Sequence, residues 1–431
     1  MKKLKVVIIG AGGRGVAYAE NIKLHPNKFQ CVGVAEPIKK RRDGLKRLLN
    51  LSEAECFDSW EDLFSQPKLA DVAIISTQDN GHYEPAMKAI EKGYHLLLEK
   101  PVAQTAKECV DIANAAREKG VKVLVCHVLR YTPFYKAVKK IVMDGIIGDI
   151  QSIIQVEAVG NRHQSHSYVR GDWSKEESAT PMLLAKSCHD MDIIQWLIDK
   201  PCKKVSSFGS LSYFTPENGP KGGPKRCIDG GCPIEDTCPY HYKKVYLSEQ
   251  ANPFFRYAVA RGYSKDFLAT DEEVLEGLKN TNFGACVYHA GNNVVDHQVV
   301  NLEFEGGATA SFTMNAFNKG GRYIRIFGTK GELYANFSDV EITIFLFENR
   351  EYKKVEVEKT EESIAGGHGG GDAGIIEELY EYMLGDYTGY CAADIDTSVR
   401  NHLIGFAAER ARHNDTVEYV ATFSEEQGFD Y

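Results

Sequence analysis

The first 128 residues alternate between short apolar runs and longer amphipathic stretches. The apolar runs are rich in Val and Ile and nearly continuous, which is typical of parallel strands covered by helices on both faces. We expect strands at 6–9, 30–35, 72–76, 95–98 and 121–128, and helices at 16–24, 41–50, 83–92 and 106–119. Because strand–helix–strand crossovers are right-handed, this order predicts a doubly wound parallel sheet of the α/β class.

A glycine-rich segment of the form G-x-G-x-x-G separates the first strand from the first helix. In a Rossmann domain such glycines permit a tight turn, let the backbone approach a pyrophosphate and let the helix pack on the strand, while the helix N terminus binds the phosphates. A plain glycine turn is the alternative. We expect a Rossmann domain that binds a nicotinamide dinucleotide through Gly10, Ala11, Gly12, Gly13, Arg14 and Gly15.

An acidic residue, Glu36, ends the second expected strand. A carboxylate at this place binds the ribose hydroxyls of NAD and repels the 2′-phosphate of NADP. Arg41 follows closely and would favour a phosphate. The pattern therefore favours NAD and leaves NADP possible.

The pattern changes in the second part of the chain, which we predict to be an α+β domain with a mostly antiparallel sheet. The expected division is a Rossmann domain at 1–128 and a substrate and oligomerisation domain at 129–431, with a cysteine-containing insertion at about 200–295. The segment 209–239 is rich in Gly, Pro and Cys and is expected to be irregular. We expect helices at 134–143, 182–198, 375–384 and 399–412, and strands from 150 onward and at 299–304, 308–315, 323–327, 333–337, 340–347 and 354–358.

The composition narrows the possible partners. The chain of 431 residues carries 51 basic and 60 acidic residues, a net charge of −9, which argues against a general surface for nucleic acid or anionic membranes. No apolar run is long enough to cross a membrane, and no secretory signal is recognisable. Together with eleven scattered cysteines, this predicts a cytoplasmic protein with reduced thiols.

Polar residues follow two expected strands. Thr77 and His82 come after the strand at 72–76, and Glu99-Lys100-Pro101 directly follows the strand at 95–98. Ligands of open α/β sheets lie beyond the carboxyl ends of the strands, so these residues are candidates for the active site. A local ion pair is the alternative for Glu99 and Lys100.

These motifs, together with Arg130-Tyr131-Thr-Pro133 and Gly145-Ile-Ile-Gly148, resemble the Gfo/Idh/MocA family of glucose-fructose oxidoreductases and inositol dehydrogenases. The resemblance covers 4–155 and resumes around 187–192, 306–331 and 370–372. It implies an NAD(P)-dependent enzyme that oxidises or reduces a carbinol carbon of a sugar, cyclitol or glycoside, and a homodimer or homotetramer. It also implies a cis peptide bond before Pro101.

The same resemblance implies the catalytic roles. Lys100 would touch the nicotinamide and the substrate hydroxyl, His189 would face the nicotinamide, and Thr77, His82 and Glu99 would line the cofactor. A histidine suits removal of a hydroxyl proton near neutral pH, and a cationic lysine would stabilise a developing alkoxide. A buried structural histidine is the alternative for His189.

One position departs from the family. An Asp usually lies one turn before the histidine, and here that position is Ala185, with Lys186 next to it. Either Asp190, Asp372 or the substrate replaces this partner of His189, or the reaction is not a simple dehydrogenation. Candidate substrate-binding residues are Arg130, Tyr131, Tyr168, Arg170, Trp173 and Lys186, although a packed loop explains the segment 166–173 equally well.

A cluster of soft ligands lies in the irregular segment: Cys227, Cys232, Cys238 and His241. Such a loop lacks periodic apolar residues, and a structural zinc would supply a cross-link. Free thiols, an iron–sulfur centre or a disulfide remain alternatives, and Cys188 or Cys202 could replace His241.

Three functions are compatible with these features: a carbohydrate-type oxidoreductase, a glycoside-cleaving enzyme that oxidises its substrate transiently with no net redox change, and a cofactor-binding sensor without catalysis.

Overall fold

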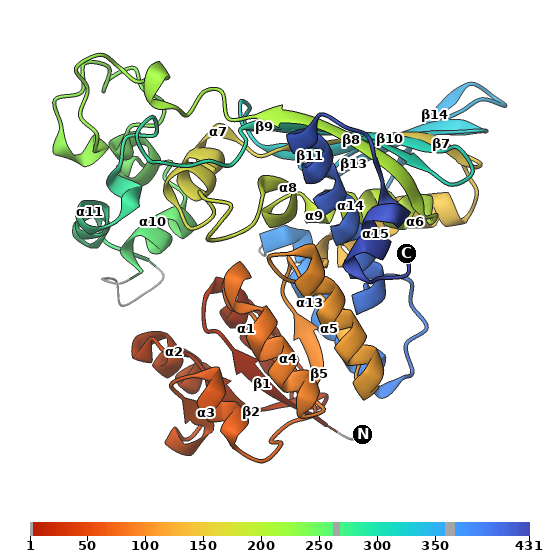
Figure 1. Cartoon of the computed structure of the whole chain (residues 1–431), viewed down its shortest axis with the longest axis horizontal. Helices are drawn as coiled ribbons and strands as arrows, with labels where there is room; N and C mark the ends of the chain where they lie inside the picture. The colour runs from red at the N-terminus through yellow and green to blue at the C-terminus, as the bar shows by residue number, and fades with distance from the viewer. Residues whose placement is uncertain (1–2, 262–267, 358–366) are drawn as a thin grey trace.

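The computed structural model describes residues 3–261, 268–357 and 367–431. Its N-terminal part is a six-stranded parallel sheet in the order β3-β2-β1-β4-β5-β6 (Figure 1). The predicted α/β Rossmann architecture is confirmed. The strands are β1 (Leu4–Ile9), β2 (Phe29–Ala35), β3 (Cys56–Phe57), β4 (Val72–Ile75), β5 (His95–Leu98) and β6 (Val123–Val125).

The helices of this part follow the expected positions and begin and end at recognisable caps. Thr105 and Glu108 form a capping box at the start of α5, and Gly120 ends it in the left-handed conformation. The helices are α1 (Gly13–Leu24), α2 (Lys39–Leu49), α3 (Trp60–Ser65), α4 (Tyr83–Glu91) and α5 (Ala106–Lys119).

The strand expected at 121–128 is shorter than predicted. β6 ends at Val125, and 128–131 forms a 3₁₀ turn that leads into α6 (Pro133–Met143). Thr132 caps α6, and Pro133 occupies its first turn. The 3₁₀ turn therefore begins at Val128, where the strand was expected to end.

The second sheet has nine strands in the order β14-β13-β12-β11-β7-β10-β9-β8-β15. Only the β7–β10 pair is parallel, so the predicted mostly antiparallel sheet is confirmed. The strands are β7 (Ile150–Ala158), β8 (Cys202–Ser210), β9 (His297–Phe304), β10 (Thr309–Asn315), β11 (Gly321–Gly328), β12 (Gly331–Asn336), β13 (Glu341–Leu346), β14 (Glu351–Val355) and β15 (Glu418–Tyr419). The strand expected at 354–358 corresponds to β14, which lies three residues earlier in the chain. Residue 358 falls outside the described residues.

Helices lie between this sheet and the Rossmann domain, and the opposite face of the sheet carries none (Figure 1). α9 (Cys188–Ile198) packs on β7, and α14 (Ile395–Asn414) contacts β8, α5 and α9. α13 (Gly371–Leu384) contacts α1, so it joins the two parts of the chain. α15 (Val420–Gln427) completes the layer.

The single helix expected at 182–198 is broken into α8 (Met182–Ala185) and α9. Ser187, with φ −95° and ψ 7°, leaves helical geometry. In a continuous helix the Ala185 carbonyl would accept the His189 N–H. The break frees this carbonyl for another donor.

The insertion lies between β8 and β9 and begins later than the expected residue 200, because β8 belongs to the sheet. It contains α10 (Pro253–Ala260) and α11 (Asp271–Asn280) and forms the lobe at the left of Figure 1. Its apolar side chains form two small clusters separate from the main core. No helix of the described residues has the length and apolarity needed to cross a membrane.

Candidate active site

The glycine loop has the geometry of a phosphate-binding turn. Gly10 has φ +94°, and a Cβ there would lie 2.7 Å from the Ser76 carbonyl oxygen. A Cβ on Gly15 would lie 2.1 Å from the Gly10 oxygen, so this glycine lets α1 pack against the turn. A Cβ on Gly12 would meet no protein atom within 4 Å, and no side chain caps α1 at this residue. The open space and the uncapped N–H groups fit a pyrophosphate.

Glu36 is buried at the end of β2 and faces this loop. Its carboxylate accepts the Ala11 N–H at 2.7 Å and the Ile38 N–H at 3.0 Å. This places a fixed negative charge where the ribose of a dinucleotide binds in the Rossmann fold. Arg42 donates to the Glu36 carbonyl and pairs with Asp58, whereas Arg41 is half-buried on α2.

Arg14 connects the glycine loop to β5 and to α13. Its guanidinium donates to Glu99 at 2.5 Å and to both oxygens of Asp372 at 2.7 and 2.8 Å. Burial alone would raise the pKa of Glu99, but Arg14 and Lys100 outweigh it and hold that pKa below its ordinary value. Glu99 is therefore an anion. Its ion pair with Arg14 orients the guanidinium toward Asp372, which belongs to the second domain.

The turn after β5 is held by residues from three elements. The Lys100–Pro101 peptide bond is cis, as the resemblance implies. Glu99 accepts the Lys100 N–H at 2.9 Å, and His82 Nδ1 lies 2.7 Å from the Pro101 carbonyl oxygen. His402, on α14, accepts the Val102 N–H at 3.1 Å. Thr77, by contrast, donates its hydroxyl to the Gly81 carbonyl at 2.7 Å.

Lys100 reaches into the second domain. Its Nζ donates to the Ala185 carbonyl at 2.7 Å, at the break that separates α8 from α9. His189 is 4 % exposed and lies in the first turn of α9. The structure thus brings the end of β5 against the start of the helix that carries His189.

Two further histidines, which sequence reasoning missed, lie beneath this junction. The His127 ring lies 6.0 Å from that of His189 and 5.6 Å from that of His402. Burial, followed by Arg130 and Lys100, lowers the pKa of His127 well below its ordinary value. Burial, followed by His127, lowers the pKa of His402 to about 3. Both rings are neutral at pH 7. In the sequence, the one feature that could have indicated His127 as a site residue is its position just after the last expected strand, at the carboxyl edge of the sheet.

The carboxylates considered as partners of His189 have other contacts. Asp190 accepts from Arg322 at 2.8 Å and from Gln155 at 2.7 Å, and Asp372 binds Arg14. Lys186 pairs with Glu157 at 3.4 Å.

The candidate substrate residues divide into two groups. Arg130 is 2 % exposed, and its guanidinium binds both oxygens of Asp192 at 2.8 and 2.6 Å. Tyr131 is buried to the same extent, and Arg170 donates to the carbonyls of Ala285 and Tyr240 in the insertion. The contacts of Arg130 and Arg170 are therefore with protein groups, and a substrate role for the three residues stays a prediction.

The second group lies at the domain boundary. The Tyr168 ring lies 6.3 Å from that of Trp173, and the Trp173 Nε1–H donates to both oxygens of Asp79 at 3.2 Å. Asp79 follows β4, so this contact connects the turn after the helical segment α7 (Asn161–His163) and Gln164–Arg170 to the carboxyl edge of the Rossmann sheet.

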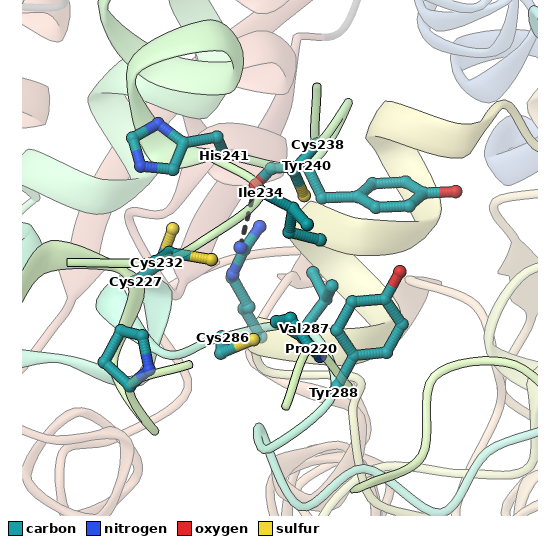
Figure 2. A pocket seen from close by; sticks show the side chains of 12 residues that line it. Pro220, Cys227, Cys232, Ile234, Cys238, Tyr240, His241, Cys286, Val287 and Tyr288 are labelled. Carbon is teal, nitrogen blue, oxygen red and sulfur yellow. Dashed lines mark hydrogen bonds between the residues drawn. The ribbon is translucent and has the colours of Figure 1, made fainter. Parts of the chain in front are cut away.

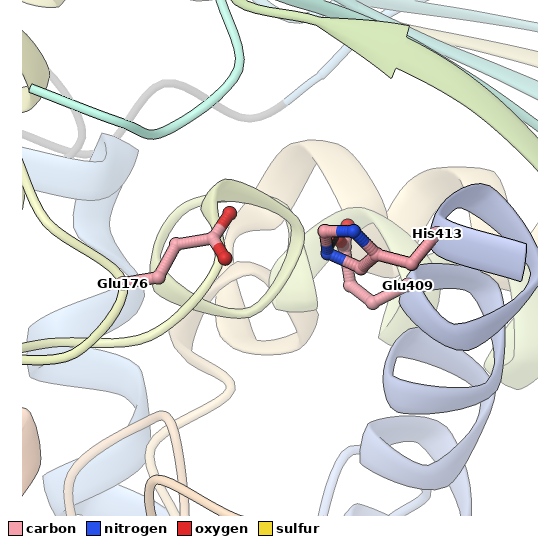
Figure 3. A group of neighbouring side chains, drawn as sticks. All are labelled: Glu176, Glu409 and His413. Carbon is pink, nitrogen blue, oxygen red and sulfur yellow. Dashed lines mark ion pairs between the residues drawn. The ribbon is translucent and has the colours of Figure 1, made fainter.

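Two groups of side chains have ligands that suit metals. Cys227, Cys232, Cys238 and His241 line one small cavity, together with Cys286 and Arg170 (Figure 2). Glu176, Glu409 and His413 have donor atoms within 4.8 Å of one another (Figure 3). Arg412 already donates to Glu409 at 2.6 Å and to Glu176 at 3.5 Å, so Arg412 and the two glutamates form an ion-pair network. The eleven cysteines all belong to the described residues and form no disulfide.

Comparisons with known proteins agree with this geometry. Residues 4–127 match the oxidoreductase family with an NAD-binding Rossmann fold (Gfo/Idh/MocA), and 139–418 match the C-terminal alpha/beta domain of that family. The oxidoreductase YteT of Bacillus subtilis (strain 168) is 25% identical over 79% of this chain and 78% of its own length. The 2,7-anhydro-N-acetylneuraminate hydratase of Escherichia coli (strain K12) is 27% identical over 48% of this chain and 54% of its own length.

Solved structures share the fold. A levoglucosan dehydrogenase in complex with NADH and levoglucosan has a TM-score of 0.69 at 16% identity and covers 97% of this chain and 100% of its own. An NAD binding oxidoreductase from Klebsiella pneumoniae has the same TM-score at 18% identity, with coverage of 97% and 99%. The chain belongs to the Gfo/Idh/MocA family and is an NAD(P)-dependent oxidoreductase.

Proposed function

We propose that this enzyme transfers a hydride between NAD and the carbinol carbon of a sugar, cyclitol or glycoside, with Lys100 and His189 as its catalytic residues. The 2.7 Å hydrogen bond from Lys100 to the Ala185 carbonyl carries the proposal, because it joins the end of β5 to the helix of His189. The similarity to an inositol 2-dehydrogenase and to the levoglucosan dehydrogenase supports the substrate class.

The bound nicotinamide supplies the hydride acceptor or donor. The glycine loop would hold the pyrophosphate. Glu36 would bind the ribose hydroxyls, and this carboxylate favours NAD over NADP. An ammonium has three N–H donors, so Lys100 can hold a substrate oxygen while it binds Ala185. The cation stabilises negative charge on that oxygen as the proton leaves.

His189 would take the proton of the substrate hydroxyl, since a neutral imidazole is a suitable base near pH 7. Tyr168 and Trp173 offer aromatic faces to a sugar ring, and Lys186 offers a cation to its hydroxyls. Trp173 is held by Asp79, which follows β4, so it is positioned near the cofactor edge of the sheet.

A second candidate is the cleavage of a glycoside through transient oxidation and elimination, with no net redox change. Ala185 favours it, because the carboxylate usual in the family is missing beside His189. The similarity to a protein named a hydratase also favours it, since hydration involves no net redox change.

One set of assays separates the two functions. The purified enzyme is incubated with NAD and a panel of sugars, cyclitols, sugar acids and chromogenic glycosides, and the absorbance of NADH and of the released aglycone is followed. Steady NADH formation supports the dehydrogenase. Release of a chromogenic aglycone at constant NADH supports the glycoside-cleaving enzyme. Cofactor binding without either reaction supports a sensor and would overturn the proposal.

We also propose a homodimer or homotetramer assembled through the uncovered face of the second sheet. Large apolar side chains on its strands are exposed, among them Ile154, Phe208, Tyr323, Tyr334 and Tyr352. Exposed apolar patches of this kind mark protein interfaces. Light scattering coupled to gel filtration tests this: a monomer would contradict it, and Phe208→Lys should weaken the assembly.

A further inference from the structure

The insertion contains a small cavity lined by cysteines from two distant parts of the chain. Cys227, Cys232 and Cys238 come from the Gly- and Pro-rich loop, and Cys286 comes from the end of the insertion (Figure 2). The cavity is about 10 Å³, which is the space of one water molecule or ion. The segment supplies four thiols around a volume that suits a single metal ion.

The backbone holds Cys286 beside the loop. The Cys286 N–H donates to the Lys225 carbonyl at 2.9 Å, and a bridge pairs Arg226 with Ala285. The Arg226 side chain also donates to the Leu278 carbonyl at 2.6 Å, which fixes this strand-like contact to α11. Cys286 is therefore positioned by main-chain pairing and not by chance proximity of a surface loop.

A buried cation beside the thiols points to a bound ion. Arg170 is 2 % exposed and lines the cavity, and its Nε and Nη2 donate to the carbonyls of Ala285 and Tyr240 at 2.7 and 2.9 Å. Its Nη1 has no hydrogen-bond partner, and no carboxylate of the described residues forms an ion pair with Arg170. An unpaired charge in a protein interior is costly.

We propose that Cys227, Cys232, Cys238 and Cys286 bind a structural Zn²⁺ ion, with Arg170 as the counter-ion of the metal centre. Four thiolates and one Zn²⁺ carry a net charge of −2, so the centre compensates the guanidinium and offers sulfur as acceptor to Nη1. Each thiol loses its proton to solvent on binding. Tetrahedral coordination at about 2.3 Å then cross-links a loop that has little apolar core of its own.

Cys286 takes the place of His241 as the fourth ligand. His241 lines the same cavity, and its Nε2 is buried without a hydrogen-bond partner, but Cys286 is fixed beside the loop by main-chain pairing with Lys225. No three of the cysteine sulfurs lie within 4.8 Å of one another in the described structure. Binding therefore requires the side chains to turn toward a common centre.

The experiment measures metal in the full-length protein purified from zinc-supplemented medium. We expect one zinc ion per chain in the wild type, its loss in Cys286→Ser, and its retention in His241→Ala. Cys56→Ser, a change in β3 far from the insertion, is the matched control and should keep the ion. Replacement by Co²⁺ should give the intense thiolate-to-metal absorption of an all-sulfur tetrahedral site.

A readout on the wild type keeps the test decisive if the variants do not fold. Four fewer thiols should react with a chromogenic disulfide reagent in the native protein than after removal of the metal by a chelator. Less than half a zinc ion per chain, iron with inorganic sulfide in its place, or loss of zinc in His241→Ala with retention in Cys286→Ser would each overturn the proposal.

Discussion

The Nζ of Lys100 donates a 2.7 Å hydrogen bond to the main-chain carbonyl of Ala185. The two residues belong to different domains, and the carbonyl is available because α8 ends at Ala185 and α9 begins only at Cys188. A carbonyl oxygen holds the ammonium in place without neutralising its charge. A carboxylate in the same place would neutralise that charge. The contact with the carbonyl therefore leaves the charge of Lys100 able to act on a substrate oxygen.

Lys100→Met should lower kcat by a factor of about 100 or more, because a donor that stabilises a developing oxyanion contributes on this scale. NADH affinity, followed by fluorescence titration, should change little. Lys122→Met is the matched control: this lysine also joins the domains, through hydrogen bonds to the carbonyls of Tyr382 and Met383. A Lys100→Met enzyme with unchanged kcat would remove Lys100 from the chemistry.

Glu36→Ala should raise the ratio of kcat/KM for NADP to that for NAD about tenfold, which corresponds to about 1.4 kcal/mol. The carboxylate that repels the 2′-phosphate is then removed, while Arg41 and Arg42 remain nearby. Loss of the hydrogen bond to Ala11 weakens both cofactors, so the ratio is the informative quantity. Glu20→Ala, on the exposed face of α1, should leave the ratio unchanged. An equal ratio in the two variants would contradict a role of Glu36 in cofactor selection.

Elements with strong local patterns were predictable from the sequence. The apolar runs of β1, β4 and β5 and the capped helix α5 need no tertiary information. β8 was missed, because Cys-Lys-Lys-Val-Ser-Ser has weak alternation and its strand geometry depends on pairing with β9. No Gly or Pro in the sequence marks the break before α9. The Ala185 carbonyl at this break accepts a hydrogen bond from Lys100, 85 residues away.

The candidate site was predictable only where a motif existed. The glycine loop, Glu36 and Lys100 follow strand ends, and their place at the carboxyl edge follows from the fold. His127 and His402 are brought together by packing between a strand end and a C-terminal helix, which no local pattern encodes. The partner of Arg130 is likewise set by packing, because its guanidinium binds the buried Asp192, 62 residues away.

Ala185→Asp should raise the apparent pKa of the acidic limb of the kcat/KM profile by about one unit. A carboxylate at this position favours the protonated form of a neighbouring imidazole, so the base is deprotonated at higher pH. Ala185→Asn is the matched control, because it has the same shape without the charge. If Asp and Asn give the same profile, the new carboxylate does not interact with the catalytic base.

The buried neutral histidines should make the protein less stable as the pH falls below about 6.5, the ordinary pKa of histidine. Because the pKa of His402 is about 3 in the folded chain, only the unfolded chain takes up this proton between these two values. Proton binding to the unfolded chain favours unfolding, so stability is full above about pH 6.5 and decreases toward acid. For His402 the loss is about 1.4 kcal/mol at one pH unit below the unfolded pKa. His127, whose pKa is also depressed, acts in the same direction.

Urea unfolding at pH 7.5 and 5.5 measures this effect in wild type and His402→Gln. The glutamine cannot take up a proton in the unfolded chain, so its midpoint should fall less between the two pH values than that of the wild type. His413→Gln, an exposed histidine on the same helix α14, should keep the wild-type dependence. Equal decreases in all three proteins would show that protonation of His402 does not contribute to acid unfolding. The difference between the two pH values is independent of the general cost of replacing a side chain that bonds Val102 and Ser398, because that cost applies at both.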